Sequence, residues 1–280
     1  MQPKIYAKDP TTGIDNALRD REDLISVCVD HFHHDPDAKY KVFIQMEPQN
    51  TWQVTPRLIQ EHNYYDVILA WDQEVLDKCH NAIPLDFLGL WIHTDTFKSD
   101  KKNEISFITS DKAMFDGHLL RQRVYKRIEG IPGIGEFSLN LVRSPPKIPS
   151  KNPMFEHAKF AIVIENTSRR NLMSEKLVDA LYTKTVPIYW GAPNVGEFFN
   201  SKGILSFETE EELYNILSVL TPELYDRLAD SGVLEENYER CLKHTSFYQP
   251  IDAAIDKHIY CLKNAYNPTD IERGCVPPKA

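Results

Sequence analysis

Cysteine is scarce in this chain of 280 residues, and the five cysteines are scattered along it. Their number is odd, and no two of them have the short spacing that is typical of zinc ligands. We therefore expect neither a disulfide framework nor a zinc site, and we interpret the cysteines as free thiols in a reducing compartment. The five residues are Cys28, Cys79, Cys241, Cys261 and Cys275.

The chain also lacks a positive net charge and long apolar runs. Its formal net charge of −9 argues against a protein that binds nucleic acid through general electrostatics, because neutralising phosphates requires a basic surface. No apolar run approaches the roughly 18 residues that a membrane-spanning helix needs, and the polar N-terminal segment does not resemble a secretion signal. We expect no membrane span and a cytoplasmic location, which would be the host cytoplasm for a viral protein.

Two phosphate-site motifs are missing as well. No G-x-G-x-x-G follows an early strand pattern, which disfavours a dinucleotide-binding oxidoreductase. The triplet Asp35-Pro36-Asp37 has acidic residues at the spacing that can hold a metal against a diphosphate, but it contains a proline and lies in a polar segment. The neighbouring histidines His31, His33 and His34 have no recognised ligand spacing and are interpreted as part of a loop. We therefore expect no metal requirement and no bound cofactor.

The remaining composition is ordinary for a globular protein, with 42% hydrophobic and 26% charged residues. Strand patterns alternate with helix patterns, which predicts an α/β protein with parallel sheets. The segment 130–153 is rich in Gly, Pro and Ser, so we place a domain boundary there, between domains 1–145 and 146–280. A final helix near 251–265 could pack back on the first domain. The predicted strands are 24–32, 40–46, 66–71, 88–92, 104–109, 160–164, 186–189 and 203–207; the predicted helices are 55–62, 116–129, 210–220 and 222–228, besides one that begins after Ser174.

A strand pattern at 160–164 ends in two polar residues, Glu165 and Asn166. The next strand pattern, 186–189, ends at Tyr189 and is followed by Gly191, a residue suited to a sharp turn. Ligands of open α/β sheets bind at the carboxyl edge of the strands, so these strand ends predict a binding site.

Between these two strands, Ser174 is placed to cap a helix that begins with Glu175 and Lys176. The free backbone N–H groups and the positive dipole end of such a helix favour a phosphate, and Lys176 adds a full positive charge. Glu175 is placed where a carboxylate can accept hydrogen bonds from ribose hydroxyls. For each charged residue taken alone, a solvated surface position is the more common alternative.

This stretch resembles the donor motif of the inverting α-1,3-fucosyltransferases, glycosyltransferase family 10. The order and spacing agree: Glu165-Asn166, eight residues, Glu175-Lys176, then the run from Val186 to Gly191. About forty residues match closely and most of the chain matches loosely. The resemblance implies a GT-B architecture, two Rossmann-like domains with a cleft between them, in which the first domain mainly holds the acceptor and the second binds the nucleotide sugar.

By position, the family's sugar-nucleotide contacts correspond to Asn166, Glu175 and Lys176, and its diphosphate-binding arginine corresponds to Arg121. Ser174 and Tyr189 join the same donor site through the motif. One position departs from the family pattern, because Leu172 stands where members often have an aromatic residue. The chain also resembles xylosyltransferases that chloroviruses encode and that are related to this family. This second resemblance implies UDP-xylose as the donor, with GDP-fucose as the next candidate. It also implies a fucose-containing glycan of a glycoprotein as the acceptor.

An inverting transfer needs a base that takes the proton of the acceptor hydroxyl, and a carboxylate suits this role because it also stabilises the positive charge that develops on the sugar. Asp72 is the first candidate, since it follows the strand 66–71 and lies near the position of the family's base. Glu74 is the second candidate and Glu47, which follows the strand 40–46, is the third. The alternative for a single acidic residue at a strand end is a helix cap or a turn former.

Tryptophans are candidates for the acceptor side because an indole can stack on a sugar ring. Trp52, in a polar segment, and Trp71 are the two that we assign to acceptor binding; Trp91 is a further possibility, and core packing is the alternative for each. Two other function classes compete with glycosyl transfer. A non-catalytic nucleotide-sugar or glycan-binding protein would keep Glu175, Lys176 and Arg121, whereas a glycosidase would have no use for a phosphate-binding helix start.

Overall fold

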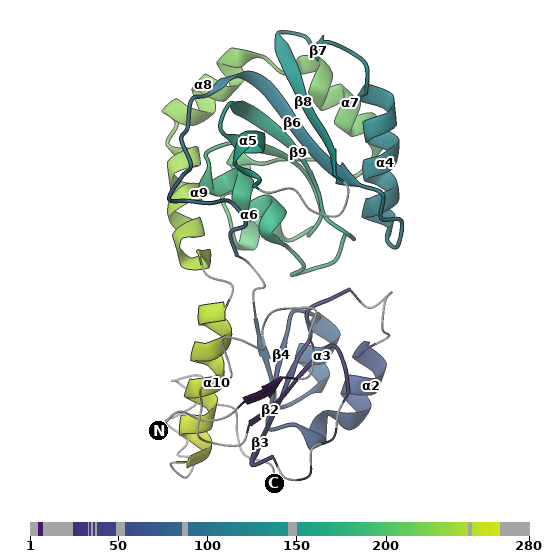
Figure 1. Cartoon of the computed structure of the whole chain (residues 1–280), viewed down its shortest axis with the longest axis vertical. Coiled ribbons are helices and arrows are strands. Elements are labelled where there is room, and N and C mark those ends of the chain that lie inside the picture. Colours follow the sequence, from purple (N-terminus) through teal and green to yellow (C-terminus); the bar gives the residue numbers. More distant parts are fainter. Residues whose placement is uncertain are drawn as a thin grey trace. The chain divides into compact units, whose positions relative to one another are not determined.

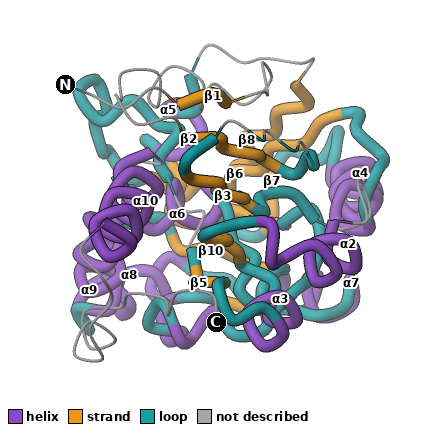
Figure 2. Tube along the Cα trace, turned by 90° about the horizontal axis from the view of Figure 1, so that it is seen from below, coloured by secondary structure: helices purple, strands orange, loops and turns teal. Residues whose placement is uncertain are grey.

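A computed structural model describes residues 5–7, 25–32, 34, 36, 38–48, 54–85, 89–144, 150–245 and 248–263. The chain divides into two compact units (Figure 1). The first unit comprises residues 1–87 together with 247–280, and the second comprises 88–246. Helices and strands, coloured separately in Figure 2, occur in both, so the α/β class predicted from the sequence is confirmed.

The first unit contains a five-stranded sheet in which every pair of neighbouring strands is parallel. The strand order in space follows the order in the chain, so each connection adds the next strand at the same side. The strands are β1 (Ile5–Ala7), β2 (Ile25–Val29), β3 (Tyr40–Ile44), β4 (Val67–Ala70) and β5 (Ala82–Pro84).

Helices cover both faces of this sheet, which explains why its central strands consist mostly of apolar residues. On one face, Ile251, Ile255 and Ile259 of α10 pack against β2, β3 and β4. On the other face, Val54 and Leu58 of α2 pack with α3 against the alternate residues of the same strands. The helices are α2 (Val54–Glu61), the 3₁₀ helix η1 (His62–Tyr64), α3 (Gln73–Lys78) and α10 (Tyr248–Lys263).

The second unit contains a six-stranded sheet in the order β11-β10-β9-β6-β8-β7. All of its strand pairs are parallel except β7 with β8, which form an antiparallel hairpin at one edge. The strands are β6 (Lys102–Ser110), β7 (Gly133–Ile134), β8 (Phe137–Ser144), β9 (Ala158–Ile164), β10 (Val186–Trp190) and β11 (Leu205–Ser206).

Alternate residues of β9 face two different cores in this unit. Phe160, Ile162 and Ile164 pack toward α4, α7 and α8, whereas Ala161 and Val163 pack toward α5 and α6. A two-sided α/β layer of this kind brings the ends of the parallel strands to one edge. The helices are α4 (Asp116–Ile128), α5 (Asn152–Phe155), α6 (Glu175–Tyr182), η2 (Val195–Glu197), η3 (Ser201–Gly203), α7 (Glu210–Val219), α8 (Pro222–Asp230), α9 (Val233–Cys241) and η4 (Leu242–His244).

The division into units differs from the boundary that we expected between residues 145 and 146. The strands β6 and β8 belong to the same sheet as β9, because β6 pairs with β9 on one side and with β8 on the other. The segment 130–153 is therefore not a linker between domains. Gly133 and Gly135 belong to the β7–β8 hairpin, and Pro153 lies in the first turn of α5.

Two further expectations need correction. Residues 89–92 of the strand expected at 88–92 are not a strand, and the fifth strand of the first sheet is the shorter β5. The strand β8 was not expected, although its residues alternate between apolar and polar over much of their length.

Within the described residues no helix is long and apolar enough to cross a membrane. In the same part of the chain, Cys28, Cys79 and Cys241 are buried and form no disulfide with one another.

Lys101 ties the amino edge of the second sheet together, and its removal gives the first testable prediction. Its Nζ donates to the carbonyl oxygens of Phe155 (2.7 Å) and Ala158 (3.0 Å) and to Thr185 Oγ1 (2.6 Å). We expect Lys101→Met to lower the free energy of unfolding by about 3 kcal/mol, because buried acceptors lose their donor. Chemical denaturation measures the change.

The adjacent Lys102 supplies the matched control, since its side chain is exposed and pairs with Asp100 at the surface, at 3.0 Å. Lys102→Met should leave the stability close to that of the unmodified protein. Equal effects of the two substitutions would contradict the role of the three Lys101 hydrogen bonds in stabilising the sheet.

Candidate functional site

The carboxyl end of β9 carries a buried carboxylate, Glu165, whose side chain is 3% exposed. Its two oxygens accept hydrogen bonds from Ser174, one from the backbone N–H (2.9 Å to Oε1) and one from the hydroxyl (2.6 Å to Oε2). Burial is the largest influence on Glu165 and raises its pKa, while Lys176 opposes this increase. The carboxylate thus joins the end of the strand to the start of the following helix.

Ser174 is the N-cap residue of α6, as the sequence predicted. Its hydroxyl oxygen accepts from the backbone N–H of Lys176 at 3.4 Å and from Lys176 Nζ at 3.0 Å. Lys176 is half-buried, and its Nζ lies 3.2 Å from Glu175 Oε1 and 3.8 Å from Glu165 Oε2. The structure therefore brings the expected cation to the N-terminus of α6.

Glu175, the first residue of α6, lies between two lysines. Its Oε1 is 3.2 Å from Lys176 Nζ and 3.3 Å from Lys151 Nζ. Burial acts to raise the pKa of Glu175, but the two lysines together outweigh it and lower the pKa to about 2. Glu175 is consequently an ionised hydrogen-bond acceptor at physiological pH.

Lys151 extends this charged cluster to a third carboxylate, Asp179, which is fully buried on α6. The distance from Lys151 Nζ to Asp179 Oδ2 is 3.2 Å. Asp179 Oδ1 accepts from the backbone N–H groups of Trp91 (2.8 Å) and Ile92 (3.3 Å), and burial raises its pKa. Asp179 therefore fixes the backbone of the 91–92 segment beside α6.

Arg121 on α4 reaches the same strand end from the other face of the sheet. Its Nη1 donates to the carbonyl oxygen of Ile164 (2.6 Å) and its Nη2 to Asn166 Oδ1 (3.0 Å). Because a guanidinium only donates, the amide oxygen of Asn166 faces Arg121. Burial lowers the pKa of Arg121, with Glu165 and Glu175 acting in the opposite direction. Arg121 is buried, so in this structure it positions Asn166.

His118, one turn before Arg121, supports Asn166 as well. Its Nδ1 accepts from the backbone N–H of Phe115 at 3.2 Å, which places the proton of the neutral ring on Nε2. Burial, followed by the charge of Arg121, lowers the pKa of His118 to about 4. A hydrogen bond with Asn166 opposes this decrease. The imidazole is thus neutral at physiological pH.

Gly117 allows α4 to approach the strand end this closely. Its backbone N–H donates to the carbonyl oxygen of Asn166 at 3.0 Å, and a Cβ at this position would lie 1.8 Å from the carbonyl oxygen of Glu165. No side chain fits at such a distance, so a glycine is required here. The contact fixes the N-terminus of α4 against residues 165–166.

Tyr189 is in the same unit but is buried, 2% exposed. Its hydroxyl accepts from the backbone N–H of Ala192 at 2.9 Å and so closes the turn after β10, and burial raises its pKa well above the usual value. Gly191 fits against this turn, since a Cβ there would lie 2.2 Å from the Tyr189 hydroxyl. Tyr189 therefore shapes the turn, and a direct contact with a ligand stays a prediction.

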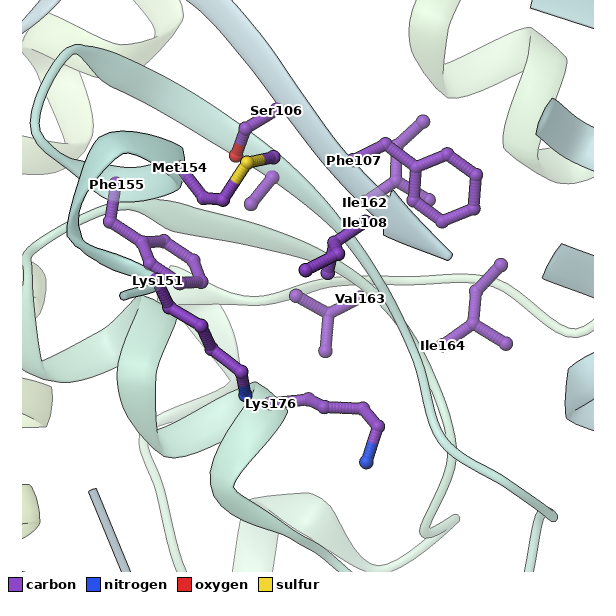
Figure 3. A pocket seen from close by; sticks show the side chains of 11 residues that line it. Ser106, Phe107, Ile108, Lys151, Met154, Phe155, Ile162, Val163, Ile164 and Lys176 are labelled. Atoms are coloured by element: carbon purple, nitrogen blue, oxygen red, sulfur yellow. The ribbon is translucent and has the colours of Figure 1, made fainter. Parts of the chain in front are cut away.

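A pocket of about 380 Å³, including space open to solvent, lies on the α5–α6 side of the sheet. Residues of β6 and β9 form its floor, Met154 and Phe155 of α5 form a wall, and Lys151 and Lys176 supply its charge (Figure 3). The pocket is thus apolar on one side and cationic on the other.

Asp72, in the first unit, is the N-cap residue of α3 and is 8% exposed. Its Oδ1 accepts from the backbone N–H of Glu74 at 3.0 Å, and its Oδ2 accepts from the Thr55 hydroxyl at 2.7 Å. Thr55 in turn accepts from Gln45 Nε2 at 2.7 Å. The capping role, which the sequence left open as the alternative, is therefore occupied, and a role as base stays a prediction.

The other two carboxylate candidates are exposed. Glu74 pairs with Lys78 at 2.7 Å on the surface of α3. Glu47 follows β3, and its backbone N–H donates to Asp30 Oδ2 at 2.9 Å. Trp71 is 4% exposed, which supports core packing over stacking on an acceptor, and Trp52 lies outside the described residues.

Four contributors to the cluster were not identified as functional from the sequence: Lys151, Asp179, His118 and Gly117. Lys151 lies in a segment that was interpreted as a linker, and no pattern distinguished it. Asp179 lies among the apolar residues of α6. An acidic residue within that apolar pattern was the sequence signal that could have identified it. Among the residues that the structure describes, no three His, Cys, Asp or Glu side chains are grouped so as to hold a metal ion.

No protein-family model matches the chain. Over 59 residues it is 37% identical to the alpha-(1,3)-fucosyltransferase FucT of Helicobacter pylori, and over 42 residues it is 50% identical to an alpha-(1,4)-fucosyltransferase of Arabidopsis thaliana. These segments cover 21% and 15% of this chain, and 12% and 10% of the two relatives. The sequence similarity to fucosyltransferases is thus confined to a small part of each protein.

The structural similarity extends over nearly the whole chain. A crystal structure of an α1,3-fucosyltransferase with GDP matches with a TM-score of 0.53 and 18% identity, covering 91% of this chain and 86% of that chain. A structure of an α1,3-fucosyltransferase with GDP-fucose matches with a TM-score of 0.52 and 17% identity, covering 89% and 88%. The predicted fold class, α/β of the GT-B type, is confirmed.

The depressed pKa of Glu175 gives a prediction for stability against pH. A carboxylate whose pKa falls from 4.5 to about 2 on folding contributes stability that is fully present above pH 4.5 and is lost as the pH falls through about 2. We expect the difference in unfolding free energy between the unmodified protein and Glu175→Gln to shrink by about 3 kcal/mol over this interval. Urea denaturation at a series of pH values measures it.

Glu235→Gln is the control, because Glu235 is exposed and its ion pair with Lys184 lies at the surface. Its difference from the unmodified protein should stay small at every pH. Burial, the largest cause of the raised pKa values of Glu165 and Asp179, acts in all three proteins, whereas Glu175→Gln removes the smaller increase that the charge of Glu175 adds to both. A Glu175→Gln difference that is flat or increases on acidification would contradict the paired state of Glu175.

Proposed function

We propose that this protein is an inverting glycosyltransferase that takes its sugar from a nucleotide-sugar donor. The observation that carries the proposal is the arrangement at the end of β9, where Glu165 holds the capped N-terminus of α6 and Lys176 stands beside it. A helix N-terminus with an adjacent ammonium group suits a diphosphate. The similarity to fucosyltransferases, in a short stretch of sequence and in the fold, supports glycosyl transfer from a nucleotide sugar.

In the proposed complex, the diphosphate lies by the start of α6, where Lys176 and the backbone N–H groups offset its charge as the bond to the sugar breaks. Asn166 presents its Nδ2 group to the donor, because Arg121 holds the oxygen of its amide. Glu175 accepts from the ribose hydroxyls, since the two lysines keep it ionised. Each group is thus assigned the part for which its charge is suited.

For the donor we propose UDP-xylose, with GDP-fucose as the alternative. The resemblance to the xylosyltransferase branch and Leu172, which stands at an often aromatic position and is buried here, support the first. The similarity to fucosyltransferases, one of them crystallised with GDP-fucose, supports the second. We propose a hydroxyl of a fucose-containing glycan, on an oligosaccharide or glycoprotein, as the acceptor, held by the first unit.

Calorimetric titration with UDP, GDP, UDP-xylose and GDP-fucose tests the donor proposal, each with and without EDTA. We expect binding of one nucleotide pair that EDTA does not alter. Lys176→Met should weaken it by about 10- to 100-fold, because a charged contact to phosphate is lost. Lys202→Met, which removes an exposed lysine of η3, is the control. Absence of binding to all four compounds would contradict the proposed function.

The catalytic base, which takes the proton of the acceptor hydroxyl, is the second point to test. We propose Asp72 for this role, with Glu74 and Glu47 as alternatives. Asn caps helices about as well as Asp but cannot take a proton. We therefore expect Asp72→Asn to keep the melting temperature and lose at least about 100-fold in turnover, with donor binding retained. Glu47→Gln and Glu74→Gln, assayed in parallel, would identify the base if Asp72→Asn stays active.

The same variants separate catalysis from binding alone. A non-catalytic nucleotide-sugar or glycan-binding protein would bind the donor but transfer no sugar to any fucosylated acceptor. In that case substitutions of Asp72, Glu74 and Glu47 would have no activity to change. Radiolabelled donor and a panel of fucose-containing oligosaccharides supply the assay.

A further inference from the structure

Trp91 is a large apolar side chain that stands in water, with 63% of its surface exposed. Exposing so much of an indole is unfavourable, since its burial would stabilise the protein by roughly 25 cal/mol per Å² of apolar surface. The backbone at this residue is nevertheless fixed, because the backbone N–H of Trp91 donates to Oδ1 of the fully buried Asp179 at 2.8 Å. An indole whose backbone is fixed and whose ring is open to solvent is suited to stack against a flat ring of a ligand.

The chain of contacts around Lys151 connects this indole to the proposed donor site. Lys151 Nζ lies 4.7 Å from the centroid of the Trp91 ring and 3.3 Å from Glu175 Oε1. Lys151 also lines the pocket that contains Lys176. The indole and the carboxylate to which we assign the ribose hydroxyls are therefore both neighbours of the same ammonium group.

We propose that Trp91 is the stacking platform for the nucleobase of the donor; this inference rests on the proposed function. A base is attached to the ribose that Glu175 would hold, so it must lie within a short distance of that carboxylate. Trp91 is an exposed aromatic residue of the described chain whose ring lies against Lys151, the same lysine that pairs with Glu175. Every nucleobase has a π-face, so the platform serves uracil and guanine alike and does not by itself choose the donor.

Trp91→Ala tests the platform, with UDP, GDP and inorganic pyrophosphate as probes in calorimetric titrations. We expect about a 10-fold or greater loss of affinity for whichever nucleoside diphosphate the unmodified protein binds. The affinity for pyrophosphate, which has no base, should stay unchanged. Trp91→Phe should retain most of the nucleotide affinity, because an aromatic ring remains.

The fold should tolerate these substitutions, since the side chain is exposed and its link to Asp179 is through the backbone; melting temperatures verify this. Val219→Ala removes another exposed apolar side chain, 69% exposed at the end of α7, and serves as the control. Unchanged nucleotide affinity in Trp91→Ala would overturn the inference alone. So would an equal loss for pyrophosphate, or a loss confined to glycan binding. Failure of the unmodified protein to bind any nucleotide would overturn the proposed function with it.

Discussion

The hydrogen bonds between Glu165 and Ser174 are the interaction on which the rest of the site depends. A buried carboxylate is costly unless it is paired, and here both of its oxygens are satisfied by one residue nine positions later. The pairing fixes the first turn of α6 at the end of β9. Lys176 and Glu175 belong to that turn, so their positions follow from the same contact, and Gly117 lets α4 and Arg121 approach from the other side.

Charge balance around α6 explains how so many ionisable groups share a small volume. Lys151 lies between Glu175 and Asp179, and Lys176 lies between Glu175 and Glu165, so each carboxylate has a lysine within 4 Å. In a site of this kind, removal of one member leaves another charge buried without a partner. The cluster is therefore organised before any ligand arrives, which lowers the cost of binding a charged one.

The sequence was sufficient to predict the parallel α/β class, the polar end of β9 and the capped start of α6, because each follows from local periodicity and capping chemistry. It was insufficient for the boundary at residue 145, since glycine and proline near a hairpin look the same as in a linker. Lys151 and Asp179 could not be predicted as partners, because their approach at 3.2 Å depends on tertiary packing across 28 residues. The helix cap at Asp72 was foreseen only as an alternative, because a strand-ending acid has the same local pattern in either role.

We propose above all that the N-terminus of α6 with Lys176 is the diphosphate site of a nucleotide-sugar-dependent transferase. A crystal structure of the protein with UDP or GDP, whichever binds, tests it most directly. We expect phosphate oxygens within hydrogen-bonding distance of Lys176 Nζ and of the backbone N–H groups at the start of α6. A nucleotide bound elsewhere, with this helix start vacant, would contradict it.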